Sequence, residues 1–178
     1  MTRVFRVSVI VVLTGFGLDS HAAGSDWDGK VIFMRHALAP GNGDPEHFDL
    51  GNCMTQRNLD ERGRQQAKRL GEALKERQIV FSKIYSSEWC RCQETAELLE
   101  MGEVTTLRSL NSFYEHHFSR DELLPVLQQR LSRVKTDEAP ILMVTHFVTI
   151  TAVTHRAVSS GSLVIYDPVT RESVLANF

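Results

Sequence analysis

"VIFMRHALAP", residues 31–40, places four apolar residues directly before an arginine–histidine pair. A short, continuous apolar run is typical of a strand that is buried on both faces of a parallel sheet. Packing in the core does not explain the polar pair, Arg35 and His36, that ends this strand. Because ligands bind beyond the carboxyl ends of the strands in open parallel sheets, we expect Arg35 and His36 to face a binding site.

A second segment, "APILMVTHF" at residues 139–147, repeats this pattern. Its apolar run, residues 141–144, is followed by Thr145 and His146. Between the two runs, a shorter strand within residues 79–85 precedes a polar segment that contains Arg91. If the three strands are parallel, their carboxyl ends lie at one edge of the sheet. Two histidines and two arginines should therefore converge at that edge.

The rest of the chain alternates between helical and extended patterns. Residues 58–77 predict a helix that Asp60 caps, because apolar residues recur at helical spacing after it. Pro125 should start or interrupt a later helix. A long loop at residues 37–57 contains three glycines and two prolines, and long loops in compact domains are usually functional. Further helices are expected at 88–100, 119–133 and 147–157, a short strand at 104–107, and a closing hairpin with its turn at 167–170.

Alternating strands and helices predict an α/β fold. We expect a three-layer sandwich, with a mostly parallel central sheet, helices on both faces and an antiparallel edge at the C-terminus. A chain of 178 residues with 42% apolar and 24% charged residues suits one globular domain. The net charge of −2 predicts no general affinity for nucleic acid. Any anion site must then be a local concentration of positive charge.

The N-terminus has the composition of a secretory signal peptide. Arg3 and Arg6 precede a mostly apolar stretch, and Ser20 and Ala22 fit the small-residue positions of a cleavage site. We expect a signal peptide at residues 1–22 and a folded domain at 28–178. About a dozen apolar residues are too few to cross a membrane, so no stable membrane anchor should remain after cleavage. The mature protein is expected to be exported, either periplasmic or secreted.

Export would favour a disulfide among the three cysteines, Cys53, Cys90 and Cys92. Their spacing lacks the paired pattern of a zinc site. Cys53 could pair with either Cys90 or Cys92, which would leave one thiol free. The alternative is that all three are small buried thiols.

Four ordered segments make the chain resemble the histidine phosphatase superfamily, whose fold is phosphoglycerate-mutase-like, in its small single-domain form. The family's Arg-His-Gly signature is similar to Arg35-His36-Ala37, and "LDERGRQQA" at 59–67 is similar to its L-T-x-x-G-x-x-Q-A helix start. "SSEWCRCQETA" at 86–96 keeps the arginine of a third motif, and Thr145-His146 resembles a fourth. The resemblance spans residues 31 to about 157.

The resemblance implies a covalent mechanism. His36 would attack phosphorus as a neutral imidazole and hold the phosphoryl group as phosphohistidine. Its other ring nitrogen should donate to a backbone carbonyl in the loop. Arg35 and Arg91 would bind phosphate oxygens, and His146 would assist catalysis as a cation or hydrogen-bond donor on the same oxygens. Asn42 resembles a loop asparagine that donates to phosphate. No metal and no cofactor are implied.

The proton donor is where the chain departs from the family. The family usually has a carboxylate in an L-x-E context, where this chain reads "LNSFYEHHF". Asn111 or Ser112 falls where the acid is expected, so Glu115 is the candidate to protonate the leaving oxygen and to activate water. His116 and His117 beside it could also donate a proton.

Two further features of the 37–57 loop have open interpretations. Arg57 could add positive charge to the pocket or form a salt bridge with Asp60 or Glu61. The acidic stretch at 41–49 indicates either an exposed loop or one that repels highly anionic substrates.

The expected function is that of a phosphatase that hydrolyses a small phosphomonoester, with sugar phosphates among the candidates. One alternative is a non-catalytic module that binds a phosphoryl ligand, and another is a phosphohistidine phosphatase. A metal hydrolase built on His36 and His146 is disfavoured, because flanking arginines would repel a cation.

Overall fold

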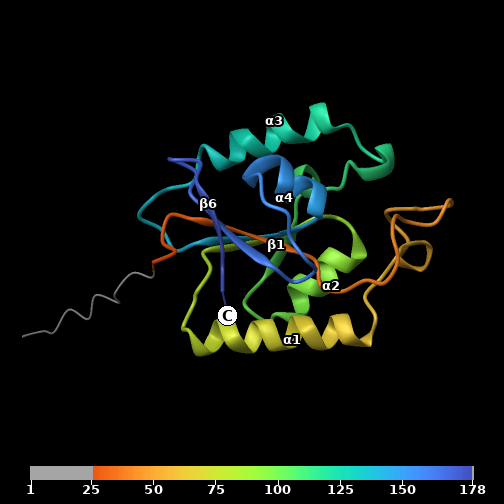
Figure 1. Ribbon diagram of the computed structural model, residues 1–178, viewed down its shortest axis with the longest axis horizontal. Helices are drawn as coiled ribbons and strands as arrows, with labels where there is room; N and C mark the ends of the chain where they lie inside the picture. The colour runs from red at the N-terminus through yellow and green to blue at the C-terminus, as the bar shows by residue number, and fades with distance from the viewer. Residues whose placement is uncertain (1–25, 178) are drawn as a thin grey trace, which may run out of the picture.

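A single mixed sheet forms the centre of the computed structural model, which describes residues 26–177 (Figure 1). Within these residues the sheet has six strands in the order β3-β2-β4-β1-β5-β6. The strands are β1 (Val31–Arg35), β2 (Lys83–Ser86), β3 (Val104–Thr106), β4 (Ile141–Thr145), β5 (Leu163–Tyr166) and β6 (Ser173–Leu175). Strands β1 to β4 are parallel, whereas β5 pairs antiparallel with β1 and β6 pairs antiparallel with β5. This confirms the expected parallel sheet with an antiparallel edge.

Helices cover both faces of the sheet, which confirms the three-layer arrangement. They are α1 (Glu61–Glu76), α2 (Cys90–Leu98), α3 (Arg120–Leu131) and α4 (Phe147–Thr154). In Figure 1, α1 and α2 lie on one face, and α3 and α4 lie on the other. Side chains alternate along β1 accordingly: Ile32 and Met34 pack with the α1–α2 layer, while Val31 and Phe33 pack with the α3–α4 layer.

The register of the parallel strands brings the predicted polar residues together. Arg35 at the end of β1 pairs with Thr145 of β4, and Ser86 at the end of β2 pairs with Val144. Strands β1, β4 and β2 therefore end at the same level, with His36, His146 and the 86–91 segment just beyond them. The sheet edge expected to hold a site is formed as predicted.

Most elements begin or end within a few residues of the expected bounds, and three differences have a physical reason. Strand β2 begins only at Lys83, because its partner β4 begins opposite it, at Ile141. Helix α3 runs through Pro125 without a break, held to the sheet by its buried leucines. Helix α4 ends at Thr154, where His155 adopts a left-handed conformation, φ 56°, and closes the helix. The cap at Asp60 is confirmed: its side chain accepts a hydrogen bond from the Gly63 backbone N–H at 2.8 Å.

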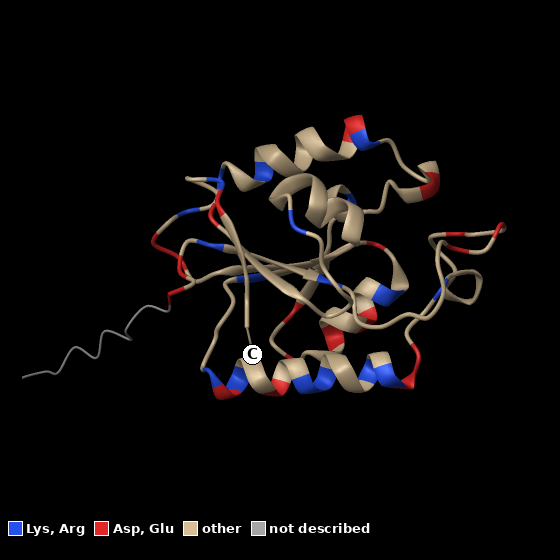
Figure 2. Ribbon diagram, in the orientation of Figure 1, with Lys and Arg blue, Asp and Glu red and all other residues tan. Residues whose placement is uncertain are grey.

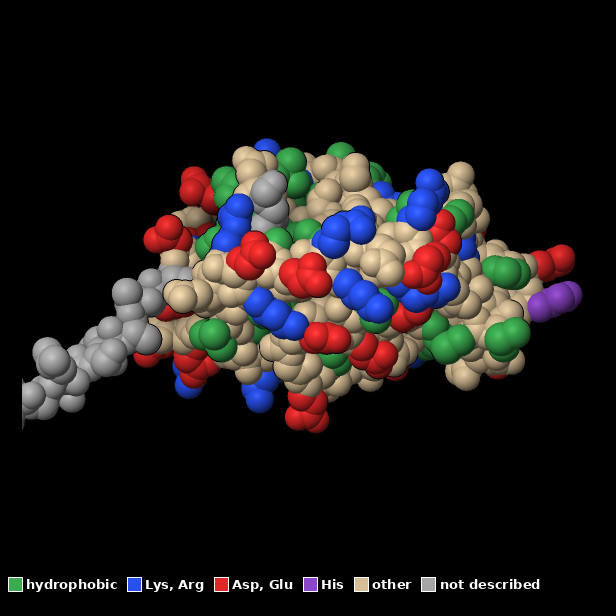
Figure 3. Space-filling view, turned by 90° about the horizontal axis from the view of Figure 1, so that it is seen from below, with side chains coloured by type: hydrophobic (Ala, Val, Ile, Leu, Met, Phe, Trp, Pro, Cys, Tyr) green, Lys and Arg blue, Asp and Glu red, His purple; other side chains and the backbone are tan. Residues whose placement is uncertain are grey.

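The outer face of α1 carries charges of both signs. Lysine and arginine alternate there with aspartate and glutamate (Figure 2), and the space-filling view of this face shows blue and red side chains interspersed (Figure 3). Such a surface attracts neither cations nor anions strongly. Among residues 26–177, no helix combines the length and the apolarity that crossing a bilayer would demand. The proposed signal peptide, residues 1–22, lies outside the described residues, so that expectation stays a prediction.

Candidate functional site

A cavity of about 200 Å³ lies at the carboxyl ends of β1, β2 and β4. Arg35, His36, Arg91 and His146, the four polar residues that were expected to converge, all line it. Asn42 from the long loop lines it as well. The remaining lining residues are Gly41, Gly43, Asp44, Arg57, Ser112, Tyr114, His117, Phe147 and Val148.

His36 is oriented by the backbone on both sides of it. Its N–H donates to the carbonyl of Thr145 at 3.0 Å, which continues the pairing of β1 with β4. Its Nδ1 lies 2.8 Å from the carbonyl of Ala37. A carbonyl only accepts hydrogen bonds, so Nδ1 carries the proton and the neutral ring keeps a free lone pair on Nε2. This is the hydrogen bond expected for a nucleophilic imidazole.

The surroundings of His36 keep its ring neutral. The side chain is buried, with 2% of its surface exposed. Burial and the positive charge of Arg91 lower the pKa of His36 from 6.5 to about 3, although the hydrogen bond to Ala37 acts in the opposite direction. Arg57 and Arg35 add smaller contributions that also lower it. The imidazole is therefore unprotonated throughout the physiological pH range.

Arg35 is fixed at the end of β1 by contacts on two sides. Its Nη1 donates to the carbonyl of Val158 at 2.8 Å, and its guanidinium carbon lies 5.5 Å from the centre of the Phe147 ring. Its Nε is buried and has no hydrogen-bond partner among residues 26–177. An arginine held in this way presents a preformed donor to an anion in the cavity.

Arg91 is held by an acidic residue that sequence reasoning did not single out. The carboxylate of Asp44 accepts from Nη1 at 2.8 Å and from Nη2 at 3.1 Å, and both side chains are 4% exposed. Burial would raise the pKa of Asp44, but the hydrogen bonds and the charge of Arg91 outweigh burial and lower it. The Asp44 side chain is thus neither exposed nor free to repel a substrate. At this position both interpretations of the 41–49 stretch, an exposed loop and a loop that repels anionic substrates, are wrong.

The same loop closes the N-terminal end of α2. The helix has no side-chain N-cap at Trp89, but Gln56 Oε1 accepts from the backbone N–H of Cys90 at 3.0 Å. Asp44 also accepts from the Trp89 indole N–H at 3.1 Å. A cation in the first turn of a helix opposes the helix dipole, and the charge of Asp44 offsets this cost for Arg91.

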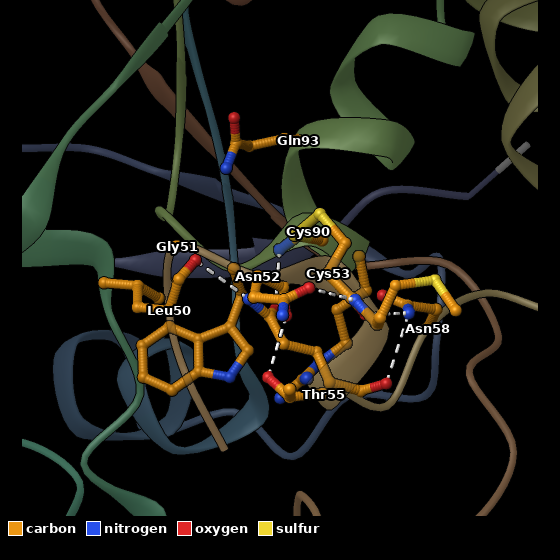
Figure 4. Close-up of a disulfide and its surroundings, with 12 residues drawn as sticks. Leu50, Gly51, Asn52, Cys53, Thr55, Asn58, Cys90 and Gln93 are labelled. Atoms are coloured by element: carbon orange, nitrogen blue, oxygen red, sulfur yellow. Dashed lines mark hydrogen bonds between the residues drawn. A yellow bond between two sulfur atoms is a disulfide. The ribbon is translucent and has the colours of Figure 1, made fainter. Parts of the chain in front are cut away.

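A disulfide between Cys53 and Cys90 joins the loop to α2 (Figure 4). This resolves the two predicted pairings, and Cys92 is the free, buried thiol. Burial raises the pKa of Cys92 to about 12, so it is not a nucleophile at neutral pH. Because Cys90 precedes Arg91 directly, the bridge fixes the loop next to an arginine of the site.

Removing the disulfide should destabilise the protein without unfolding it. The bridge closes a loop with a sequence separation of 37 residues, and we expect Cys53→Ser/Cys90→Ser to lower the free energy of unfolding by about 2–4 kcal/mol. Urea denaturation of oxidised wild type and of the double variant measures the difference. Alkylation of the denatured, unreduced protein provides the control: one labelled thiol is expected, and three labelled thiols would rule out the bridge.

His146 is buried within a hydrogen-bond network. Its Nε2 lies 2.9 Å from Ser87 Oγ, and Ser87 Oγ donates to Asn111 Oδ1 at 3.1 Å. The Glu88 backbone N–H donates to that same oxygen, which fixes it as an acceptor. The single hydroxyl proton of Ser87 is therefore used, and His146 Nε2 must be the donor to Ser87.

The charge state of His146 follows from this environment. Burial, followed by the charges of Arg91 and His36, lowers its pKa well below 6.5, so the ring is neutral. The two histidine rings lie 5.6 Å apart between centroids. A neutral His146 has one N–H, which Ser87 accepts, so only the cationic form would have a second N–H for a phosphoryl oxygen. The catalytic role of His146 stays a prediction.

Arg57 and Glu115, the other candidate residues, differ in their position relative to the cavity. Arg57 lines the cavity and donates to the carbonyls of Ala39 and Gly43. It does not pair with Asp60 or Glu61, whose arginine partners are Arg62 and Arg64, so the expected salt bridge is wrong and the added positive charge is correct. Glu115 does not line the cavity; its Oε2 lies 3.4 Å from the backbone N of Asp44.

The described residues also bear on metal binding. Within residues 26–177, no group of three or more histidine, cysteine, aspartate or glutamate side chains is arranged so that it could hold a metal ion. The positive side chains around the cavity belong to Arg35, Arg57 and Arg91, and anions rather than cations suit such a lining.

Known proteins of similar sequence or structure include several phosphatases. Over 69 residues, this chain is 38% identical to the mitochondrial serine/threonine-protein phosphatase Pgam5 of Drosophila grimshawi. The match covers 39% of this chain and 21% of that protein. The chain thus spans only about a fifth of the length of that relative.

Solved structures share the fold. The protein histidine phosphatase SixA complexed with tungstate superposes with a TM-score of 0.60 at 13% identity, covering 83% of this chain and 94% of SixA. A mycobacterial glucosyl-3-phosphoglycerate phosphatase gives a TM-score of 0.56 at 16% identity, covering 84% of this chain and 97% of that one.

The comparison with protein families shows which family this chain belongs to. The family description "Histidine phosphatase superfamily (branch 1)" matches residues 31–130, more than half of the chain. The match includes His36 and the arginines that surround it in the cavity. The chain therefore belongs to the histidine phosphatase superfamily.

Proposed function

We propose that this protein is a phosphatase that hydrolyses a small phosphomonoester through a phosphohistidine intermediate on His36. One observation carries the proposal: His36 keeps an unprotonated Nε2 inside a cavity that Arg35, Arg57 and Arg91 also line. A neutral nucleophile among fixed cations is what phosphoryl transfer needs, since most of its catalysis is positioning and charge stabilisation.

The reaction would proceed in two transfers. The lone pair of His36 Nε2 attacks phosphorus, and the bond from phosphorus to the leaving oxygen breaks as that oxygen gains a proton. Water then attacks the phosphohistidine, the N–P bond breaks, and inorganic phosphate leaves. The buried Nε groups of Arg35 and Arg91, which have no partner among the described residues, would donate to the phosphoryl oxygens in both transfers.

Three further properties belong to this proposal. Metal independence is proposed because the arginines would neutralise the phosphoryl charge that a divalent cation neutralises in other phosphatases. Export to the periplasm or the exterior, after removal of residues 1–22, is supported by the disulfide between Cys53 and Cys90, since such bonds persist in oxidising compartments. Sugar phosphates are the first substrates to test, because one phosphatase of the same fold acts on glucosyl-3-phosphoglycerate by its name.

A second candidate function is the hydrolysis of phosphohistidine. Asp44 is the one carboxylate among the residues that line the cavity in the described part of the chain, and Arg91 holds it. A nitrogen leaving group depends less on a carboxylic acid than an alkoxide does, because it is protonated more readily. SixA, a protein histidine phosphatase, shares the fold. The absence of a free acid in the cavity is the observation that favours this alternative.

A substrate panel separates these functions. Purified protein is incubated with p-nitrophenyl phosphate, sugar phosphates and phosphohistidine, with and without EDTA. We expect turnover of at least one substrate and no loss on chelation. Inhibition by EDTA would contradict metal independence. Binding of inorganic phosphate with no turnover of any substrate would identify a non-catalytic phosphoryl-binding module instead.

A further inference from the structure

The cavity lacks an obvious acid for the leaving oxygen. The segment that follows β3 places Asn111 and Ser112 where the family usually has a carboxylate. Asn111 is engaged with Glu88 and Ser87, and Ser112 lines the cavity but offers only a hydroxyl. Neither side chain has a proton that it can release near neutral pH. A different residue must supply the proton if poor leaving groups are to be cleaved.

Glu115 is displaced from the cavity by the fold of its segment. Its backbone is left-handed, with φ 57°, and its carboxylate packs against Gly43, where an added Cβ would lie 2.5 Å from Oε1. The carboxylate thus lies against the backbone of Gly43 and Asp44, and Glu115 itself is not among the lining residues. In this position Glu115 can act on a substrate only through another group.

The segment places two side chains that can carry a proton, Tyr114 and His117, in the cavity lining. Tyr114 is 51% exposed, and histidine is the more common general acid, so His117 is the stronger candidate. Its ring is fixed by aromatic contacts, with centroids 4.7 Å from Phe48 and 6.2 Å from Trp89. Its Nε2 is buried and has no hydrogen-bond partner within residues 26–177. That nitrogen lies 3.8 Å from Glu115 Oε2, within ion-pair reach but beyond a hydrogen bond.

We propose that His117 is the proton donor of this site and that Glu115 is its positioning residue. The proposal rests on the phosphatase function proposed above and identifies the group that replaces the family's carboxylate. In the first transfer, the bond from phosphorus to the leaving oxygen breaks and His117 gives that oxygen its proton from Nδ1, because Nε2 is buried beside Glu115. In the second, His117 takes a proton from the water that attacks phosphohistidine, which restores its starting state.

Two aryl phosphates of nearly equal size make the test selective. Phenolate is a poor leaving group because phenols have a pKa near 10, whereas p-nitrophenolate leaves without help. With enzyme in excess, quench-flow measures only the first transfer. We expect His117→Gln to slow the first transfer from phenyl phosphate by about 100-fold. Transfer from p-nitrophenyl phosphate should change by less than about threefold, because general-acid catalysis assists only the poorer leaving group.

Two matched variants complete the experiment. His47→Gln removes an exposed histidine that lies outside the cavity lining, and it should leave both rates unchanged. Glu115→Gln should slow only phenyl phosphate, by about tenfold, as expected for a residue that acts through His117. If His117→Gln slows transfer from both substrates equally, the proposal is overturned. It is also overturned if Glu115→Gln abolishes transfer from phenyl phosphate while His117→Gln leaves that rate unchanged.

Failure of the proposed function gives a different result. If wild type transfers no phosphoryl group from either substrate, the phosphatase assignment itself is wrong. If wild type transfers from both substrates and His117→Gln keeps the same ratio of rates, only the assignment of His117 is wrong.

Discussion

Replacing His36 with asparagine should abolish phosphoryl transfer, with a loss in kcat on the order of 10⁴-fold or more. Asparagine can still donate to the carbonyl of Ala37, as His36 Nδ1 does at 2.8 Å, but it has no nucleophilic nitrogen. The arginines of the cavity would still bind phosphate. We therefore expect the variant to lose turnover while it retains its affinity for inorganic phosphate.

The measurement joins kinetics to detection of the intermediate. Wild type quenched in alkali during turnover of ³²P-labelled substrate should carry label that is lost in acid, the behaviour of a phosphohistidine. The His36→Asn variant should carry none. Label that persists in the variant, or turnover within tenfold of wild type, would assign the nucleophile to another residue. Calorimetry with inorganic phosphate is the control for an intact cavity.

The low pKa of His36 adds a pH signature to this prediction. A folded-state pKa of about 3, against 6.5 in the unfolded chain, keeps the ring neutral from pH 7 down to pH 5. Labelling should therefore persist at pH 5, where an unperturbed histidine would be mostly protonated. The same difference lowers stability as the pH falls from about 6.5 towards 3, because the unfolded chain binds a proton that the folded protein does not.

Much of the fold was predictable because its decisive signals are local. The apolar runs 31–34 and 141–144 each end at a polar pair, and both proved to be central parallel strands. Where a boundary depends on a distant partner, the sequence was less informative. Residues 79–82 have strand-like composition, yet β2 starts only at Lys83, where β4 is available to pair.

The disulfide shows a similar limit. Cys90 and Cys92 lie two positions apart in α2, so their side chains point to nearly opposite sides of the helix. Only one of them can face the loop that carries Cys53. The spacing of cysteines along the sequence gives no indication of which side this is, and the choice depends on how α2 packs on the sheet.

Asp44 was missed for a comparable reason, although a signal for it existed. It lies 47 residues from Arg91 in sequence, within an acidic loop where exposure is the usual expectation. The signal was Arg91 itself, because a cation in the first turn of a helix opposes the helix dipole and gains from an anionic partner. We expected Arg91 to bind phosphate oxygens, whereas the structure shows that the protein also supplies an anionic partner of its own.

Replacing Asp44 with alanine should lower the free energy of unfolding by about 3–5 kcal/mol, because it leaves the charge of Arg91 buried without its partner. The variant also removes acceptors for the Trp89 indole and for the backbone N–H of Arg57. Glu46→Ala, which removes an exposed carboxylate from the same loop, is the matched control and should change stability by less than about 0.5 kcal/mol. Urea denaturation of the three proteins measures both effects.

Inorganic phosphate should restore part of the stability that Asp44→Ala loses. In wild type, Asp44 occupies both Nη groups of Arg91, so an incoming phosphate finds these donors already engaged. In the variant, Nη2 loses its acceptor and Nη1 keeps only the carbonyl of Arg57, so a bound anion can replace the missing charge. At a given concentration, a ligand stabilises the folded state more when it binds that state more tightly, so phosphate should raise the variant's unfolding free energy more than that of wild type. An equal increase in both proteins would show that Asp44 does not compete with phosphate for Arg91, and that its role is limited to holding the loop against α2.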